Sequence, residues 1–149
     1  MKTDSSLAQS SFVHIPSTVS EKAATILRTL IDPKLLPPVP EPDDVNSWAA
    51  VQQAMESYTV EQQKPLIDIL QPAVSEMFVG GVPVLEVKPK DWQGSHKLLV
   101  YIHGGAYTLL SAKSSLANAA LMAAATGLKI ISIDYTLAPH AKWQQVTDE

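Results

Sequence analysis

Apolar residues recur at helical spacing near the N-terminus. In residues 21–31 (EKAATILRTLI), one stripe is formed by Ala23, Leu27, Leu30 and Ile31. Ser20 precedes this stripe, and its hydroxyl can accept from a free N–H of a first helical turn, so the pattern predicts a helix with Ser20 as N-cap. The helix is expected to end at Asp32-Pro33, where the proline-rich segment PKLLPPVPEPDD predicts a stiff extended connector.

A second amphipathic helix is predicted to begin near Asn46 or Ser47. Its apolar stripe consists of Trp48, Val51, Met55 and Tyr58, and we interpret this stripe as a packing face rather than a cofactor site. A third, weaker helix is predicted from Thr59, because Gln62 completes a capping-box pattern with it, although Pro65 then falls in the first turns.

The hydrophobic pattern changes to the period of strands from Val74 onward. Apolar positions alternate on both sides of Gly80-Gly81, which predicts an antiparallel hairpin. Residues 97–102 (KLLVYI) and 128–133 (LKIISI) are short apolar runs with the composition of strands buried on both faces.

A helix is predicted between these two runs. Ser114 or Ser115 can cap its start, and Gly127 suits the position after its end. A strand, a helix and a second strand in this order form a right-handed crossover between adjacent parallel strands, so the fold class is expected to be α/β.

Composition excludes several classes of function. The net charge of −4 without a basic cluster argues against nucleic-acid binding, and the lack of cysteine leaves no thiolate metal site. No metal or cofactor is expected. The sequence has no apolar run long enough for a membrane helix, and residues 1–14 lack the order of a signal peptide, so a cytoplasmic protein is expected.

Two consecutive glycines follow the first apolar run in LVYIHGGAY. Gly104 and Gly105 stand at the carboxyl end of a predicted parallel strand, where ligands bind in α/β sheets. Glycine there lets backbone N–H groups converge on an anion. A dinucleotide site with Asp134 as the ribose-binding acid is one alternative, but HGGAYT does not match G-x-G-x-x-G. A tight turn without function is a second alternative, and an oxyanion hole for acyl transfer is the interpretation we favour.

The order of two motifs carries a family resemblance. HGGAYTLLSAKSS followed by IISIDYTLAPHAKW resembles the hormone-sensitive-lipase-like family of α/β-hydrolase esterases. The resemblance implies an α/β-hydrolase fold of which this chain is the N-terminal part, with an incomplete sheet: cap helices and a proline-rich linker in residues 1–72, then the leading hairpin and one parallel βαβ unit in residues 73–149.

The resemblance also implies roles for individual residues. Gly104 and Gly105 would donate to the oxyanion, while His103 would orient their loop and Ala106 would stand in place of a third glycine. The second motif, represented by Asp134, Tyr135 and Pro139, would give structural support. We expect Asp134 to anchor the loop after its own strand, and we assign His103 no acid or base role.

Departures from the family pattern limit what the chain can do. Thr136 replaces the usual arginine and His140 the usual glutamate, and no G-x-S-x-G nucleophile elbow occurs. Ser111, Ser114 and Ser115 are expected to be inert. We therefore expect the N-terminal part of a larger serine esterase, inactive by itself, that acts on small-molecule esters through an acyl-enzyme. The alternative is a catalytically silent binding or interaction module, whose last strand in residues 128–133 leaves a sheet edge unpaired and so favours a partner chain or aggregation.

Overall fold

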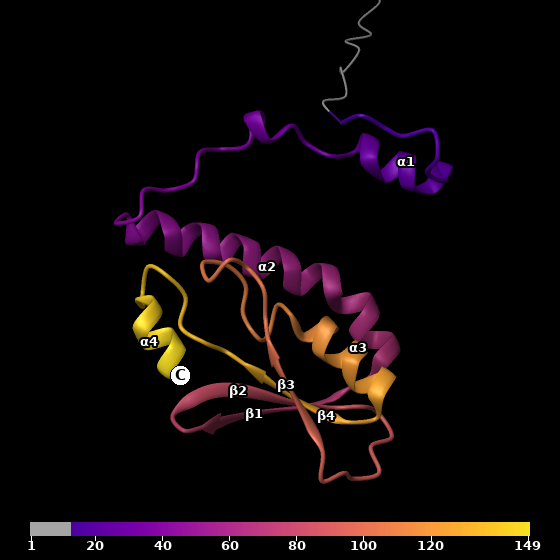
Figure 1. Cartoon of the computed structure of the whole chain (residues 1–149), viewed down its shortest axis with the longest axis vertical. Coiled ribbons are helices and arrows are strands. Elements are labelled where there is room, and N and C mark those ends of the chain that lie inside the picture. The colour runs from indigo at the N-terminus through magenta and orange to yellow at the C-terminus, as the bar shows by residue number, and fades with distance from the viewer. Residues whose placement is uncertain (1–12) are drawn as a thin grey trace, which may run out of the picture. The chain divides into compact units, whose positions relative to one another are not determined.

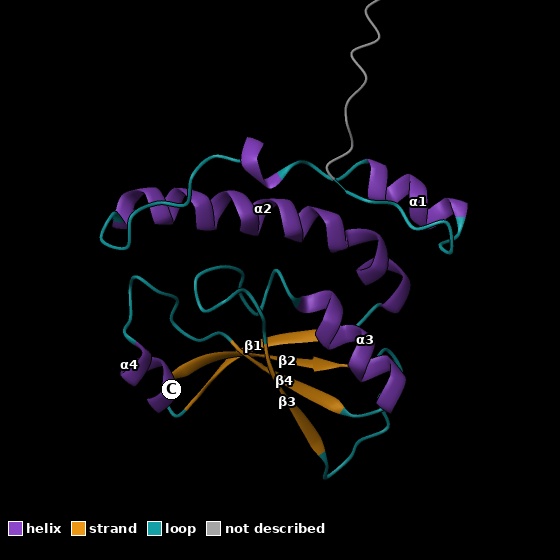
Figure 2. Ribbon diagram, turned by 45° about the horizontal axis from the view of Figure 1, so that its top comes forward, coloured by secondary structure: helices purple, strands orange, loops and turns teal. Residues whose placement is uncertain are grey.

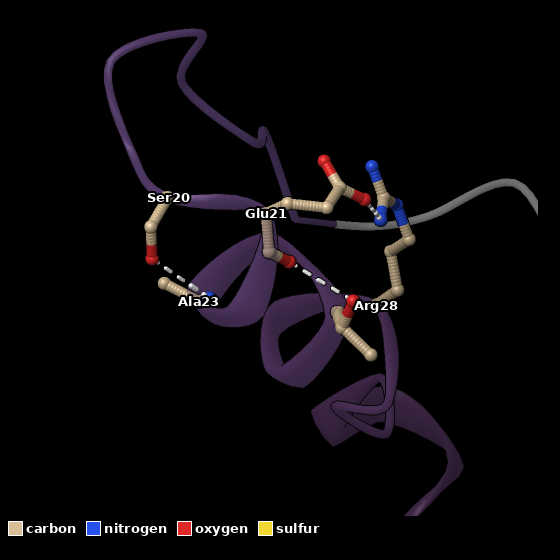
Figure 3. Close-up of polar contacts among 5 residues, drawn as sticks. Ser20, Glu21, Ala23 and Arg28 are labelled. Carbon is tan, nitrogen blue, oxygen red and sulfur yellow. Dashed lines mark hydrogen bonds and ion pairs between the residues drawn. The ribbon is translucent and has the colours of Figure 1, made fainter.

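The computed structural model describes residues 13–149, and the chain divides after Val39 into two units that are taken in turn. Residues 1–12 lie outside the described residues. They make up most of residues 1–14, the segment in which the sequence predicts no signal peptide. In the first unit, α1 spans Glu21–Arg28, and the Ser20 hydroxyl accepts the Ala23 N–H at 3.3 Å as predicted (Figure 3). The helix ends three residues earlier than predicted, because the Thr29 N–H and hydroxyl both turn back to the Ile26 carbonyl.

The proline-rich connector contains one short 3-10 turn, η1, at Pro33–Leu35. In the second unit, α2 spans Val45–Leu70 as one continuous helix, with Asp44 as N-cap. The prediction of a separate helix from Thr59 is wrong. The Thr59 hydroxyl does not cap a helix start but donates back to the Met55 carbonyl at 2.8 Å.

The helix also continues through Pro65, which supplies no backbone N–H to it. Beyond this proline, Ile67 and Leu70 pack against the hydrophobic core and hold the last turn in place. Tertiary packing here outweighs the local cost of proline.

Four strands form a mixed sheet in the order β1-β2-β4-β3. Strand β1 spans Ala73–Val79, β2 spans Val82–Lys88, β3 spans Leu98–Ile102 and β4 spans Lys129–Ile133. The predicted hairpin is confirmed, since β1 and β2 pair antiparallel across Gly80-Gly81. The predicted parallel neighbours are also confirmed, because β3 pairs with β4 from Leu98↔Lys129 to Ile102↔Ile133. The carboxyl ends of these two strands therefore lie side by side.

Helix α3, Leu116–Thr126, crosses from β3 to β4 and packs on one face of the sheet. Its alanines Ala119, Ala120 and Ala123 meet Val87 and Ile130 in the core, where small side chains allow close approach. Figures 1 and 2 both show α2 and α3 on the same side of the sheet. Ser115 occupies the predicted N-cap position but makes no side-chain cap bond, while Gly127 ends the helix with a left-handed φ of 71°.

Strand β3 is a terminal strand of the sheet and pairs on one side only, whereas the last strand, β4, pairs with both β2 and β3. The expectation that the last strand leaves a sheet edge unpaired is therefore wrong, and so is the prediction that residues 97–102 form a strand buried on both faces. Leu98, Val100 and Ile102 alternate along β3 and are 45%, 58% and 62% exposed. After β4 the chain forms a loop and a short helix, α4, at Trp143–Asp148. None of the helices described in residues 13–149 has the length and apolar character needed to cross a membrane.

Candidate functional site

The segment from His103 to Ala112, here called the glycine loop, leaves the carboxyl end of β3. Gly105 adopts a φ of +120°, and a Cβ built on it would lie 2.0 Å from the backbone oxygen of Leu109. The Gly105 carbonyl accepts the N–H groups of Thr108 and Leu109 at 3.0 and 2.9 Å. Only glycine fits at this position, because any side chain would push the turn open.

The amides at the start of the glycine loop are free of protein acceptors. Within the described part of the chain, the N–H groups of Gly104, Gly105 and Ala106 form no hydrogen bond. Gly104 is exposed, and beyond its two chain neighbours no heavy atom of the described residues lies within 4 Å of the position its Cβ would take. These N–H groups are available to donate to a ligand.

The rest of the loop has a strained backbone. Ala106, Tyr107 and Leu110 have φ values of 54°, 60° and 70°, in the left-handed region that disfavours residues with a side chain. Each such residue costs about 1–2 kcal/mol. Such a conformation persists only where surrounding contacts fix it.

His103 provides one set of these contacts. Its side chain is buried, and its Nδ1 lies 2.8 Å from the carbonyl oxygen of Gly104, so Nδ1 carries the proton. The Nε2 atom is buried and has no partner among residues 13–149. The ring stacks on Tyr135 with a centroid distance of 4.2 Å, and the Tyr135 hydroxyl donates to the His103 carbonyl at 2.9 Å. Burial raises the pKa of the Tyr135 hydroxyl, which keeps it protonated as a donor.

The second sequence motif meets the glycine loop at its far end. Asp134 accepts the N–H of Ala112 at 2.8 Å, so it anchors the loop after β3. The expectation that Asp134 anchors the loop after its own strand is therefore wrong. Ala138, which precedes Pro139 across a cis peptide bond, donates its N–H to the Tyr107 carbonyl at 2.9 Å. Both ends of the strained segment are therefore fixed by the loop after β4.

Helix α2 contacts the same loop through polar side chains that sequence reasoning missed. Gln52 donates to the carbonyl oxygens of Thr108 and Ala138, both at 2.9 Å, and Glu56 accepts from the Ser111 hydroxyl at 2.6 Å. Gln63 bridges the Lys113 carbonyl and the Ala117 N–H, both at 2.8 Å.

The apolar stripe interpreted as the packing face of α2 is largely exposed instead. Val51, Met55 and Tyr58 are 38%, 37% and 62% exposed, whereas Trp48, the first residue of the stripe, is half-buried. Glu56 and Gln63 lie four and eleven positions after Gln52, so these three polar residues lie on one face of α2. This spacing in the sequence was the signal that could have identified the contact.

Two serines of the site, Ser111 and Ser114, are occupied in structural hydrogen bonds. The Ser111 hydroxyl donates to Glu56 and accepts the N–H groups of Lys113 and Ser114 at 3.1 and 3.0 Å. The Ser114 hydroxyl accepts the Ser111 N–H at 2.9 Å. These contacts describe a tight turn, without the histidine base that activates a nucleophilic serine.

The two departures from the family pattern have their own partners. Thr136 donates its N–H and its hydroxyl to the Glu149 carboxylate at 2.7 and 2.8 Å, and these bonds lower the pKa of Glu149. His140 Nε2 lies 3.3 Å from the side-chain oxygen of Gln52. His140 is thus linked to the same glutamine that holds the glycine loop.

A pocket of about 280 Å³ lies beside the loop. Its lining consists of Tyr107, Ala138, Ala141, Trp143, Val146 and Thr147. Tyr107 is the residue that connects this pocket to the glycine loop, while Gly104 and Gly105 lie outside its lining. The mainly apolar lining suits a small apolar group.

Several known proteins are similar to parts of this chain in sequence and fold. A family described as alpha/beta hydrolase fold matches residues 99–149. LipR of Mycobacterium tuberculosis (strain ATCC 25618 / H37Rv), whose name calls it an acetyl-hydrolase, is 42% identical over 71 residues, which are 48% of this chain and 23% of that protein. The hormone-sensitive lipase of Mus musculus is 38% identical over 69 residues, 45% of this chain and 9% of that protein.

Solved structures extend the likeness over most of the chain. The crystal structure of esterase E25 matches with a TM-score of 0.68 at 23% identity, over 89% of this chain and 42% of that one. A Pyrobaculum calidifontis esterase matches with a TM-score of 0.61 at 21% identity, over 86% and 39%. The chain thus spans less than half the length of these structures and about a quarter of LipR. The chain has an α/β-hydrolase fold and resembles part of the hormone-sensitive-lipase-like esterases.

Proposed function

We propose that the glycine loop is the oxyanion hole of a carboxylic-ester hydrolase that works through a serine acyl-enzyme. The observation that carries this proposal is the pair of free N–H groups at Gly104 and Gly105, at the carboxyl end of β3. When an alkoxide attacks an ester carbonyl, the carbonyl oxygen becomes negatively charged. Two fixed amides stabilise that charge more than they stabilise the neutral ester, which lowers the barrier.

The nucleophile of this reaction lies outside the 149 residues. None of them forms a G-x-S-x-G elbow, and Ser111 and Ser114 bond within their own turn. In the proposed enzyme a serine from a further segment attacks the ester, with a histidine and an acid as its partners. Residues 1–72 contribute the helical cap segment and residues 73–149 the N-terminal part of the hydrolase core.

A silent binding module is the second candidate, and the exposed edge of the sheet favours it. Leu98, Val100 and Ile102 present apolar surface on a strand that has a free hydrogen-bonding edge. Such an edge accepts another strand readily. In this candidate the glycine loop has no catalytic task, and self-association through β3 is the main property.

A chimera separates the two candidates. Residues 40–149 replace the matching part of LipR, and hydrolysis of p-nitrophenyl acetate is measured. The enzyme proposal expects turnover that Gly105→Val lowers through kcat more than through KM, because the lost interaction belongs to the transition state. Gly94→Ala is the control, since Gly94 also has a positive φ, of +89°, but lies in another loop. A folded chimera without turnover would favour the silent module.

A further inference from the structure

We propose that Gln52 is a positioning residue for the oxyanion hole, which rests on the function proposed above. Its side-chain amide lies between two loops that the sequence separates by thirty residues. The two N–H groups of the Gln52 amide donate to Thr108 of the glycine loop and to Ala138 of the loop after β4, both at 2.9 Å. Helix α2 thereby fixes the two loops relative to each other.

Gln52 contacts the strained turn of the glycine loop. Thr108 lies between the left-handed residues Tyr107 and Leu110, and its N–H closes the turn onto the Gly105 carbonyl. The Tyr107 carbonyl is held by the Ala138 N–H. Thr108, Gln52, Ala138 and Tyr107 therefore form a closed cycle of contacts around the strained turn, and the turn places the amides of Gly104 and Gly105.

The other two polar residues of α2 act elsewhere. Glu56 binds Ser111 at the end of the glycine loop, and Gln63 binds Lys113 and Ala117 at the start of α3. Only Gln52 among these three donates to the segment between Gly105 and Leu110. Loss of Gln63 is expected to loosen α3, whereas loss of Gln52 is expected to loosen the turn that carries the free amides.

The substitution that tests this role is Gln52→Glu. A carboxylate has nearly the same shape as the amide but cannot donate, so it turns two attractive contacts with carbonyl oxygens into repulsive ones. Gln52→Ala removes the group altogether, and both variants should have the same effect. Gln53→Ala is the matched control, because Gln53 is exposed on the same helix and donates to no acceptor among the described residues.

The first measurement is amide hydrogen exchange, resolved by NMR, on the full 149-residue chain. Both Gln52 variants should exchange the N–H groups of Leu109 and Ala138 about tenfold faster and shift the amide resonances of Gly104 and Gly105. The exchange rates of core amides in β4 and the midpoint of thermal unfolding report the global stability of each variant, and the local exchange rates are compared with them. Gln63→Ala should instead accelerate Ala117. Unchanged exchange at Leu109 and Ala138 in Gln52→Glu would overturn the proposal, as would equal acceleration of every amide in the chain.

The second measurement is the kinetics of the chimera described above. Gln52→Glu should lower kcat about tenfold while KM changes less than about threefold, since only transition-state stabilisation is lost. A chimera that stays inactive counts against the proposed ester hydrolase, and the exchange experiment still decides the role of Gln52. If the chimera is active and Gln52→Glu leaves its kcat unchanged, the positioning role of Gln52 is overturned and the proposed ester hydrolase is not.

Discussion

The hydroxyl of Tyr135 donates a hydrogen bond to the backbone carbonyl of His103 at 2.9 Å, while the two rings stack 4.2 Å apart. Tyr135 follows β4 and His103 follows β3, so this single side chain joins the carboxyl ends of two parallel strands. Both residues are buried. The start of the glycine loop is thus fixed by Tyr135, which lies in the loop after the neighbouring strand β4.

Replacing Tyr135 by phenylalanine should destabilise the chain by about 1–3 kcal/mol, because the buried carbonyl of His103 loses a donor while the ring stack remains. Urea denaturation measures the difference. Tyr58→Phe serves as control, since Tyr58 is 62% exposed, and it should change the free energy of unfolding by less than about 0.5 kcal/mol. Equal stabilities of the Tyr135 variant and the parent chain would contradict the account of this contact.

Glu86 gives the chain a pH-dependent contribution to stability. Its carboxylate pairs with Lys88 and Lys129, its side chain is 13% exposed, and both bonds lower its pKa below the ordinary value of 4.5. The unfolded chain therefore takes up the proton more readily. The contribution is complete above pH 4.5 and is lost as the pH falls through the lowered pKa of the folded state.

Glu86→Gln should cost about 1–3 kcal/mol at neutral pH and progressively less in acid. Urea denaturation of both proteins from neutral pH into acid measures this difference, so that other titrating groups cancel. Glu61→Gln removes an exposed pair with Lys64 and should cost less than about 1 kcal/mol at every pH. A difference for Glu86→Gln that grows on acidification would contradict the assignment.

The edge strand β3 should mediate self-association of the chain. Val100 is 58% exposed there, and a lysine at this position would place a charge in any strand pairing. Sedimentation velocity at rising protein concentration should show association of the parent chain, and Val100→Lys should abolish it. Leu121→Lys, on an exposed position of α3, should leave association intact. A parent chain that is monomeric throughout would refute this prediction.

The 149 residues alone should react with no serine-directed probe. An activated serine is what a fluorophosphonate reports, and Ser111 and Ser114 are held in a turn without a base. Intact-mass analysis after probe treatment, beside an assay with p-nitrophenyl acetate, should show no adduct and no turnover. A stoichiometric adduct with multiple turnovers would mean that one of these serines is a nucleophile.

The sequence predicts the core of this fold well and the support of the site poorly. The apolar runs that form β3 and β4 have a strong pattern, and the crossover rule then fixes their parallel pairing, but the predicted burial fails for β3, in which four of five residues are exposed. Thr59 and Pro65 carry local signals for a helix boundary, yet α2 passes through both because Ile67 and Leu70 are packed in the core. Local propensity fails here where tertiary contacts outweigh it.

The strained turn could not be read from residue types. Gly105 signals its own backbone conformation, but Tyr107 and Leu110 also adopt a positive φ although both carry side chains. Their conformation is imposed by contacts from distant segments, among them Gln52. Apolar periodicity in the sequence gives no signal for the polar face of α2, which makes these contacts.

An amide-to-ester replacement at Gly105 measures how far the Gly105 N–H stabilises the oxyanion in the proposed enzyme. In vitro translation with glycolic acid removes this one N–H from the chimera and adds no Cβ, so the clash with Leu109 does not arise. The same replacement at Gly94 is the control. The change at Gly105 should lower kcat by about 10²–10³-fold with little change in KM. A kcat within about threefold of the unmodified chimera would contradict the proposed role of this N–H.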